Sequence, residues 1–184
     1  MRLHVIAACM TFAFAASANA ASFEFSQAGT MKVESGATRS AKLHVACSPD
    51  KSGGALSIEL TVPDANTRKD FDYEDFEGPD AEARSKLLSR LNWTGAASAT
   101  AITSTASGWY APEPPDSFMF GVSQLSRRPG APAQLLAAID GAGEFEWTQT
   151  AFDASKRKLV ATFTFDAPSA RKLRDVAAPC LPGR

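Results

Sequence analysis

The feature that most constrains the fold is a period-two alternation of apolar and polar residues, which recurs in several short segments of the chain. In one segment the alternation continues without interruption up to a proline, through Leu56, Ser57, Ile58, Glu59, Leu60, Thr61, Val62 and Pro63. Successive side chains of a β-strand point to opposite faces, so this pattern is typical of a strand with one buried face. The sequence therefore predicts a mainly β fold of the α+β type, either an antiparallel β-sandwich or a curved sheet.

Two pairs of alternating segments are close enough in the chain to form β-hairpins. Residues 41–47 and 56–62 flank a Gly-Gly turn, and residues 144–152 and 158–166 flank a polar segment of turn length. The second pair is rich in aromatic and β-branched residues, which suit the pleated surface of a sheet. We expect both pairs to form antiparallel hairpins.

Less regular segments predict further strands. Residues 117–123 place three apolar side chains on one face, and residues 97–107 are rich in Thr, Ser and Ala. Near the start, the alternation in residues 23–26 predicts a strand, and residues 30–34 are a plausible partner for it. Each of these segments is of ordinary strand length.

Three segments have features of helices. Residues 79–91 begin with a proline, contain acidic residues in the first turn and space four apolar side chains as a helix would. Residues 168–176 follow a proline, and their basic residues favour the negative end of the helix dipole. Residues 132–139 are compatible with either a short helix or a strand. The clearest helix is expected over 79–91.

The first twenty residues have the pattern of a secretory signal peptide. A basic residue, Arg2, precedes an apolar segment over 5–16, and Ala18-Asn19-Ala20 matches an A-x-A cleavage site. Two alternatives are a retained membrane anchor and lipidation at Cys9. The apolar segment is too short for a spanning helix, and too few apolar residues precede Cys9 for a lipoprotein signal. We expect cleavage after Ala20, a periplasmic or secreted location, and one β-rich domain over 21–184.

Two cysteines remain in that domain, Cys47 and Cys180. In an oxidising compartment, a disulfide between them would close a loop of about 130 residues and stabilise the fold by about 4 to 5 kcal/mol. A redox-active pair would need close spacing such as C-x-x-C, which this sequence lacks. The sequence therefore predicts a structural disulfide.

The overall charge excludes few functions. The net charge is −1 at pH 7, without the excess of basic residues that is typical of nucleic-acid-binding proteins. After the first segment, no apolar stretch is long enough to span a membrane. We therefore expect no nucleic-acid partner and no integral membrane segment in the mature chain.

The strongest local anomaly is an acidic and aromatic segment. Seven of the thirteen residues from 70 to 82 are acidic, and the candidate binding residues are Asp70, Phe71, Asp72, Tyr73, Glu74, Asp75, Phe76 and Glu77. Carboxylates attract basic partners, and aromatic side chains are frequent anchors of protein interfaces. The neighbouring pair Trp109-Tyr110 is a candidate for the same binding rim. The alternative is a solvated connection whose aromatic side chains pack onto the core.

Other chemistry has weaker support. Asp70, Asp72 and Glu74 alternate like the start of a calcium loop, but the glycine and the bidentate glutamate that an EF-hand requires are missing. The histidine that remains after cleavage, His44, is expected to be a solvated strand residue, because no nucleophile motif accompanies it. Paired carboxylates for glycoside hydrolysis cannot be recognised from sequence. No residue pattern predicts a metal, a cofactor or a catalytic residue.

These observations favour a non-enzymatic binding protein of the cell envelope, such as an inhibitor or an immunity protein, with a basic protein partner. The alternatives are an envelope glycan hydrolase that uses two carboxylates, and a calcium-binding or small-molecule-binding module. A hydrolase requires a cleft with facing carboxylates and a perturbed acid, whereas a binding protein requires only an accessible acidic surface.

Overall fold

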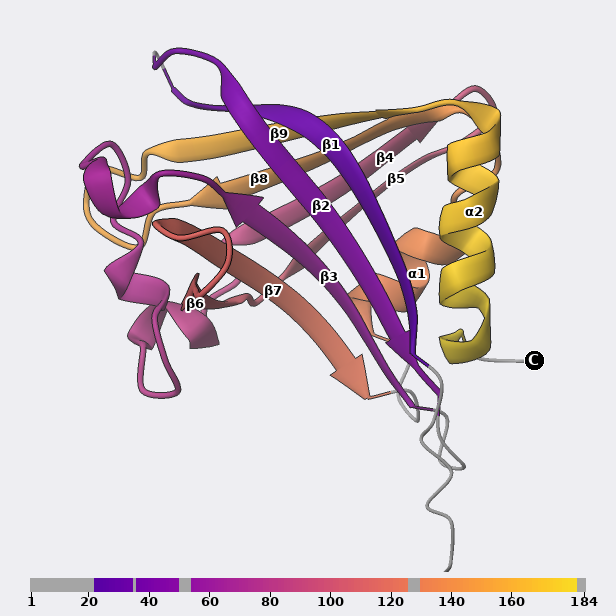
Figure 1. Ribbon diagram of the computed structural model, residues 1–184, viewed down its shortest axis with the longest axis horizontal. Helices are drawn as coiled ribbons and strands as arrows, with labels where there is room; N and C mark the ends of the chain where they lie inside the picture. The colour runs from indigo at the N-terminus through magenta and orange to yellow at the C-terminus, as the bar shows by residue number, and fades with distance from the viewer. Residues whose placement is uncertain (1–21, 35, 50–53, 126–129, 182–184) are drawn as a thin grey trace, which may run out of the picture.

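Nine antiparallel strands form one curled sheet, a half-barrel, with two α-helices (Figure 1). The computed structural model describes residues 22–34, 36–49, 54–125 and 130–181, and these counts refer to those ranges. The predicted signal peptide and its cleavage site lie outside them. The strand order is β5-β4-β8-β9-β1-β2-β3-β7-β6. The strands are β1 (Phe23–Val33), β2 (Arg39–Ser48), β3 (Ala55–Val62), β4 (Ser89–Gly95), β5 (Ala99–Ser104), β6 (Ser107–Ala111), β7 (Ser117–Leu125), β8 (Gly143–Thr150) and β9 (Lys158–Phe165).

The helical elements are short. The α-helices are α1 (Ala131–Ala137) and α2 (Ala167–Ala177), and the 3-10 helices are η1 (Ala65–Thr67), η2 (Glu74–Phe76), η3 (Glu82–Ser85) and η4 (Ala178–Cys180). The helix predicted over 168–176 is thus confirmed as α2, and the segment 132–139, which was compatible with either a helix or a strand, forms α1. Asp166 caps α2 by accepting a hydrogen bond from the Ser169 N–H at 2.8 Å. No helix within the described ranges is long and apolar enough to cross a membrane.

Both predicted hairpins are confirmed. β2 pairs with β3, with Val45 opposite Ile58, and β8 pairs with β9, with Trp147 opposite Ala161. The strand expected over 117–123 is β7. The segment 97–107 is divided, because its first part forms β5 and its last residue begins β6.

The predicted pairing of residues 23–26 with 30–34 is wrong, because both lie in the single strand β1. This strand pairs with β2 from Phe23 to Met31 but with β9 only from Thr30 to Val33. Gly29 lies where the pairing with β9 stops, and a Cβ there would collide with the ring of Phe163. The glycine therefore permits a close approach of β9, and the two halves of the sheet cross at an angle from this point (Figure 1).

The helix predicted over 79–91 is also wrong. Residues 82–85 form η3, and β4 begins at Ser89. Helical spacing would place Leu87 and Leu91 on one face, yet Leu87 is 67% exposed and Leu91 is fully buried. Leu91 instead lies with Trp93 on the buried face of β4, and both residues pair with β8. Pairing in the sheet therefore overrides the local helical spacing.

The buried face of the sheet encloses an apolar core. Its largest fully buried side chains include Trp93, Trp147, Phe145 and Phe163. Helix α2 packs against β1, β2 and β9, while α1 packs against β5, β7 and β3. β5 and β6 lie at opposite ends of the strand order but are joined by only two residues, so the sheet curls and its two edges approach each other at this connection without pairing.

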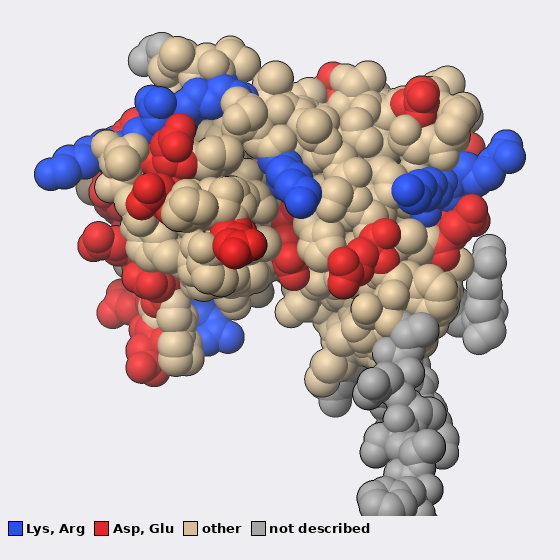
Figure 2. Space-filling model, viewed as in Figure 1, with Lys and Arg blue, Asp and Glu red and all other residues tan. Residues whose placement is uncertain are grey.

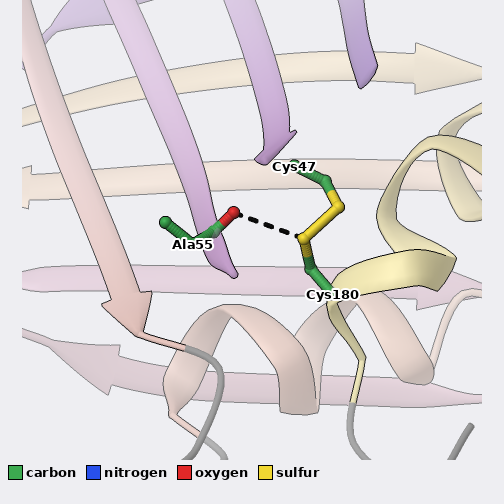
Figure 3. Close-up of a disulfide and its surroundings, with 3 residues drawn as sticks. All are labelled: Cys47, Ala55 and Cys180. Carbon is green, nitrogen blue, oxygen red and sulfur yellow. Dashed lines mark hydrogen bonds between the residues drawn. A yellow bond between two sulfur atoms is a disulfide. The ribbon is translucent and has the colours of Figure 1, made fainter. Parts of the chain in front are cut away.

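The predicted disulfide is present. Cys47, at the end of β2, is bonded to Cys180 in η4, and the two Cα atoms are 5.8 Å apart. The Cys180 sulfur lies 3.3 Å from the carbonyl oxygen of Ala55 (Figure 3), a close polar contact, since a disulfide sulfur has no proton to donate. Both cysteines are buried. The bond ties the C-terminal helix to the central strands, and such bonds are typical of oxidising extracellular compartments.

Candidate binding site in the acidic segment

Residues 63–88 connect β3 to β4 and contain η1, η2 and η3. Acidic side chains gather at this end of the molecule, on the left of Figure 2. The connection is also joined to the edge of the sheet, because Glu77 forms a parallel bridge with Gly108 and the Gly78 N–H donates to the Gly108 carbonyl at 3.2 Å. It thus covers the outer edge of β6.

The three aromatic side chains of the segment point into the core. Phe71 and Tyr73 are each 2% exposed, and Phe76 is fully buried. Tyr73 lies 5.3 Å from Phe118 between ring centroids, and Phe76 lies 5.3 Å from Phe120. Burial, together with the charge of a nearby aspartate, raises the pKa of the Tyr73 hydroxyl to about 12. These aromatic side chains anchor the segment, and they are too deeply buried to serve as exposed anchors for a partner.

Two arginines that are distant in the sequence also hold the segment, Arg39 in β2 and Arg157 in the connection between β8 and β9. Arg39 of β2 forms an ion pair with Asp70 at 2.9 Å. Arg157 donates to the Asp70 carbonyl at 2.7 Å and to the Asp72 carboxylate at 2.9 Å. Arg157 is also within 3.7 Å of Asp153. Asp70 is therefore paired mainly within the protein, and Arg157 orients the Asp72 carboxylate at the surface.

The remaining carboxylates face solvent. Glu74 and Glu77 are exposed, and the Asp72 side chain is 48% exposed despite its ion pair. Asp75 is half-buried, and its pKa is raised, first by desolvation and then by the charges of Asp72, Asp153, Glu74 and Glu82. Desolvation is the largest cause, and the neighbouring carboxylates add a local excess of negative charge that favours the approach of a cation.

A pocket of about 400 Å³ lies beside these carboxylates. It is lined by Ala65, Asn66, Arg68, Lys69, Phe71, Asp72, Tyr73, Glu74, Asp75 and Tyr110. Tyr110 is half-buried and packs edge-on against Phe118 at 5.0 Å. Its pKa is raised by partial burial and by the nearby charges of Glu74 and Glu77. The pocket thus combines one aromatic wall with three carboxylates and two basic groups.

The structure separates the candidate pair Trp109-Tyr110. Successive residues of a strand point to opposite faces, so Tyr110 joins the pocket while Trp109 lies on the outer face of the sheet, over Gly121. Arg39 and Arg157 were missed by the sequence analysis. An isolated arginine gives no sign of the distant loop that it contacts.

No group of three or more His, Cys, Asp or Glu side chains within the described ranges is arranged to hold a metal ion. His44, expected to be a solvated strand residue, is half-buried and paired with Glu59 at 3.0 Å. This contact raises the pKa of His44, an effect that desolvation opposes.

Comparisons with protein-family models, with curated proteins and with solved structures found no match to this chain.

Proposed function

We propose that this chain is an exported, non-enzymatic binding protein that recognises a basic protein partner through the acidic pocket. The observation that supports the proposal is the pocket itself, where Asp72, Glu74 and Asp75 lie beside the half-buried ring of Tyr110. A lysine or arginine side chain of a partner would contact these carboxylates and also the ring of Tyr110. An inhibitor of a basic secreted enzyme, or an immunity protein, would use such a surface in the periplasm or outside the cell.

The anchoring of the segment favours this role. Phe71, Tyr73 and Phe76 are buried, and two arginines hold the backbone and carboxylates of residues 70 and 72. A segment already fixed in position loses little conformational entropy when it binds, so more of the interaction energy contributes to affinity. Exposed carboxylates around the pocket would also accelerate the approach of a cationic partner.

The chemistry of the pocket favours arginine over lysine. A planar guanidinium can bind a carboxylate in a bidentate manner and stack on an aromatic ring, whereas an ammonium group acts as a point charge. Tyr110 would supply the ring, and Asp72 or Glu74 the carboxylate. Arg68 and Lys69, also in the lining, would repel a partner whose basic residues approached from their side and would thereby orient it.

The test compares two variants with the same change in charge. In the first, Asp72, Glu74, Asp75 and Glu77 are replaced by Asn or Gln. In the matched control, four exposed acids elsewhere are replaced in the same way, namely Glu113, Asp140, Glu144 and Asp175. The probes are an arginine-rich peptide and its citrulline counterpart, measured by fluorescence anisotropy at low and high salt.

We expect the arginine peptide to bind the unmodified protein in a salt-sensitive manner and the citrulline peptide to bind weakly. Four contacts of about 0.5 kcal/mol each would weaken binding by about 30-fold in the pocket variant. Equal losses in both variants would show an effect of net charge alone and would contradict the proposal. Pull-down from envelope and culture-supernatant fractions with the same three proteins would then identify the natural partner.

One observation favours the glycan hydrolase as a second candidate. Asp75 has a raised pKa and shares a pocket with Asp72 and Glu74, as a general acid beside a second carboxylate would. Turnover of peptidoglycan fragments that is abolished by Asp75→Asn would establish this activity. A protein that binds the arginine peptide but releases no reducing sugar would exclude it for these substrates.

A further inference from the structure

A row of side chains crosses the outer face of the sheet, on the side opposite the core. The strand register places Gly121 of β7 opposite Glu59 of β3, and Glu59 opposite His44 of β2. His44 in turn lies opposite Ser26 of β1. At the other end, Trp109 of β6 reaches diagonally over Gly121. The row therefore spans five neighbouring strands, about 19 Å at the usual strand spacing.

Trp109 occupies the space that a side chain at position 121 would fill. A Cβ built on Gly121 would lie 2.8 Å from Cη2 and 2.9 Å from Cζ3 of the indole, and 3.8 Å from Cγ of Glu59. The six-membered ring thus lies over the glycine, on the same face of the sheet as the Glu59 side chain. Trp109 is half-buried, whereas Trp93 and Trp147 are fully buried in the core. It is the tryptophan that retains an accessible aromatic surface among the described residues.

The polar part of the row is held in a fixed geometry. Glu59 accepts a hydrogen bond from the Ser57 hydroxyl at 3.1 Å, and its other oxygen lies 3.0 Å from Nδ1 of His44. Nε2 of His44 lies 3.7 Å from the Glu24 carboxylate, too far for a direct hydrogen bond. The side chains of Glu59 and His44 are 19% and 23% exposed, and that of Glu24 is 62% exposed.

We propose that this row binds an oligosaccharide, with one sugar ring stacked on Trp109 and its hydroxyl groups bonded to Glu59 and His44. A sugar ring has an apolar C–H face that packs on an indole, and hydroxyl groups that both donate and accept hydrogen bonds. Glu59 supplies acceptors next to the ring of Trp109. A hydroxyl group beside the 3.7 Å gap, about 2.8 Å from both atoms, would bond to Nε2 of His44 and to the Glu24 carboxylate.

The composition of the face favours this ligand over a protein. A stable protein interface usually has an apolar or aromatic centre of considerable area. On this face Trp109 and Met119 are adjacent and half-buried, while the rest of the row is polar or glycine. The arrangement also differs from the acidic pocket, because it is reached from the opposite face of β6. The inference is therefore independent of the proposed recognition of a basic protein.

The experiment titrates the mature protein with a glycan array and then with soluble oligosaccharides from the envelope, including peptidoglycan fragments and chitotetraose. Intrinsic tryptophan fluorescence is the readout, because Trp93 and Trp147 are fully buried and a change on binding would report on Trp109. Calorimetry provides affinities for Trp109→Ala, for Glu59→Gln and for the variant of the acidic pocket. Thermal unfolding shows whether each variant remains folded.

We expect saturable binding of at least one glycan, weakened at least about tenfold by Trp109→Ala, which corresponds to about 1.4 kcal/mol. Glu59→Gln should weaken it as well, and the variant of the acidic pocket should bind normally. If Trp109→Ala proves unfolded, Trp109→Phe replaces it and should weaken the binding to a smaller extent. Absence of binding on the array, or binding that is insensitive to both Trp109 and Glu59, would overturn the proposal.

Discussion

Removal of the disulfide between Cys47 and Cys180 should cost this fold much of its stability. The bond joins residues 133 positions apart. In the chain-entropy model, opening a loop of this length adds about 17 cal/mol/K to the entropy of the unfolded chain, or about 5 kcal/mol at 25 °C. Domains of this size are typically stable by about 5 to 15 kcal/mol. The double variant Cys47→Ala/Cys180→Ala should therefore be marginally stable.

Urea denaturation followed by circular dichroism measures this loss. With a slope of about 2 kcal/mol per molar urea, a loss of about 5 kcal/mol lowers the midpoint by about 2.5 M. The slope itself should rise, because an unfolded chain without the cross-link is more expanded and exposes more surface. The wild-type protein measured in a reductant is the matched control, since it loses the bond but retains both sulfur atoms.

The two measurements separate the cross-link from the packing. If the reduced protein and the double variant lose similar amounts, the loss comes from the constraint on the unfolded chain. A loss below about 1 kcal/mol in both would refute the reasoning. It would mean that residual structure already restricts the unfolded chain without the cross-link, or that native strain offsets the entropy.

Three further predictions concern charges and packing. Glu59→Gln should destabilise the protein most between about pH 4.5 and 6.5. The lowered pKa of Glu59 contributes stability that is lost as pH falls, and the raised pKa of His44 contributes stability that is lost as pH rises. Equal losses of stability at about pH 3, 5.5 and 9 in urea denaturation would contradict this prediction. Arg157→Met should cost about 1 kcal/mol and accelerate hydrogen exchange in residues 68–78 while leaving α2 unchanged. Gly29→Ala should lower the free energy of unfolding by about 1 to 3 kcal/mol, because its methyl group would collide with β9. Gly141→Ala, where the space around the Cβ is open, is the control and should leave the thermal unfolding of the protein unchanged.

The parts of the fold that sequence reasoning predicted are those decided by local pattern. The hairpins β2–β3 and β8–β9 join segments that are adjacent in the chain, so alternation and a turn signal are sufficient. The pairing of β1 with β9 and of β4 with β8 joins segments far apart in sequence. The alternation of apolar and polar residues does not indicate which distant strand is the partner. The error over 79–91 has the same origin, because its outcome depends on the pairing of Leu91 and Trp93 with β8.

For the candidate site, the sequence identified a segment of the chain but not the orientation of its side chains. The density of carboxylates identified residues 70–77, and residues 71–75 of this segment line a pocket. Whether Phe71 and Tyr73 would be exposed anchors or core residues depended on Phe118 and Phe120, more than forty residues away along the chain. The tie between Arg157 and Asp72 also joins distant segments. A burial pattern imposed by distant partners cannot be derived from local composition.

The consecutive residues Trp109 and Tyr110 provide a way to separate the two proposed sites. They point to opposite faces of β6, so Trp109→Ala should weaken glycan binding alone and Tyr110→Ala should weaken binding of the arginine peptide alone. Gly108→Ala should affect both, because a Cβ there would collide with Phe118 and with Cβ of Phe76, displacing β6 and the acidic segment together. Loss of both activities in Trp109→Ala, in a protein with unchanged thermal stability, would mean that the two surfaces do not act independently.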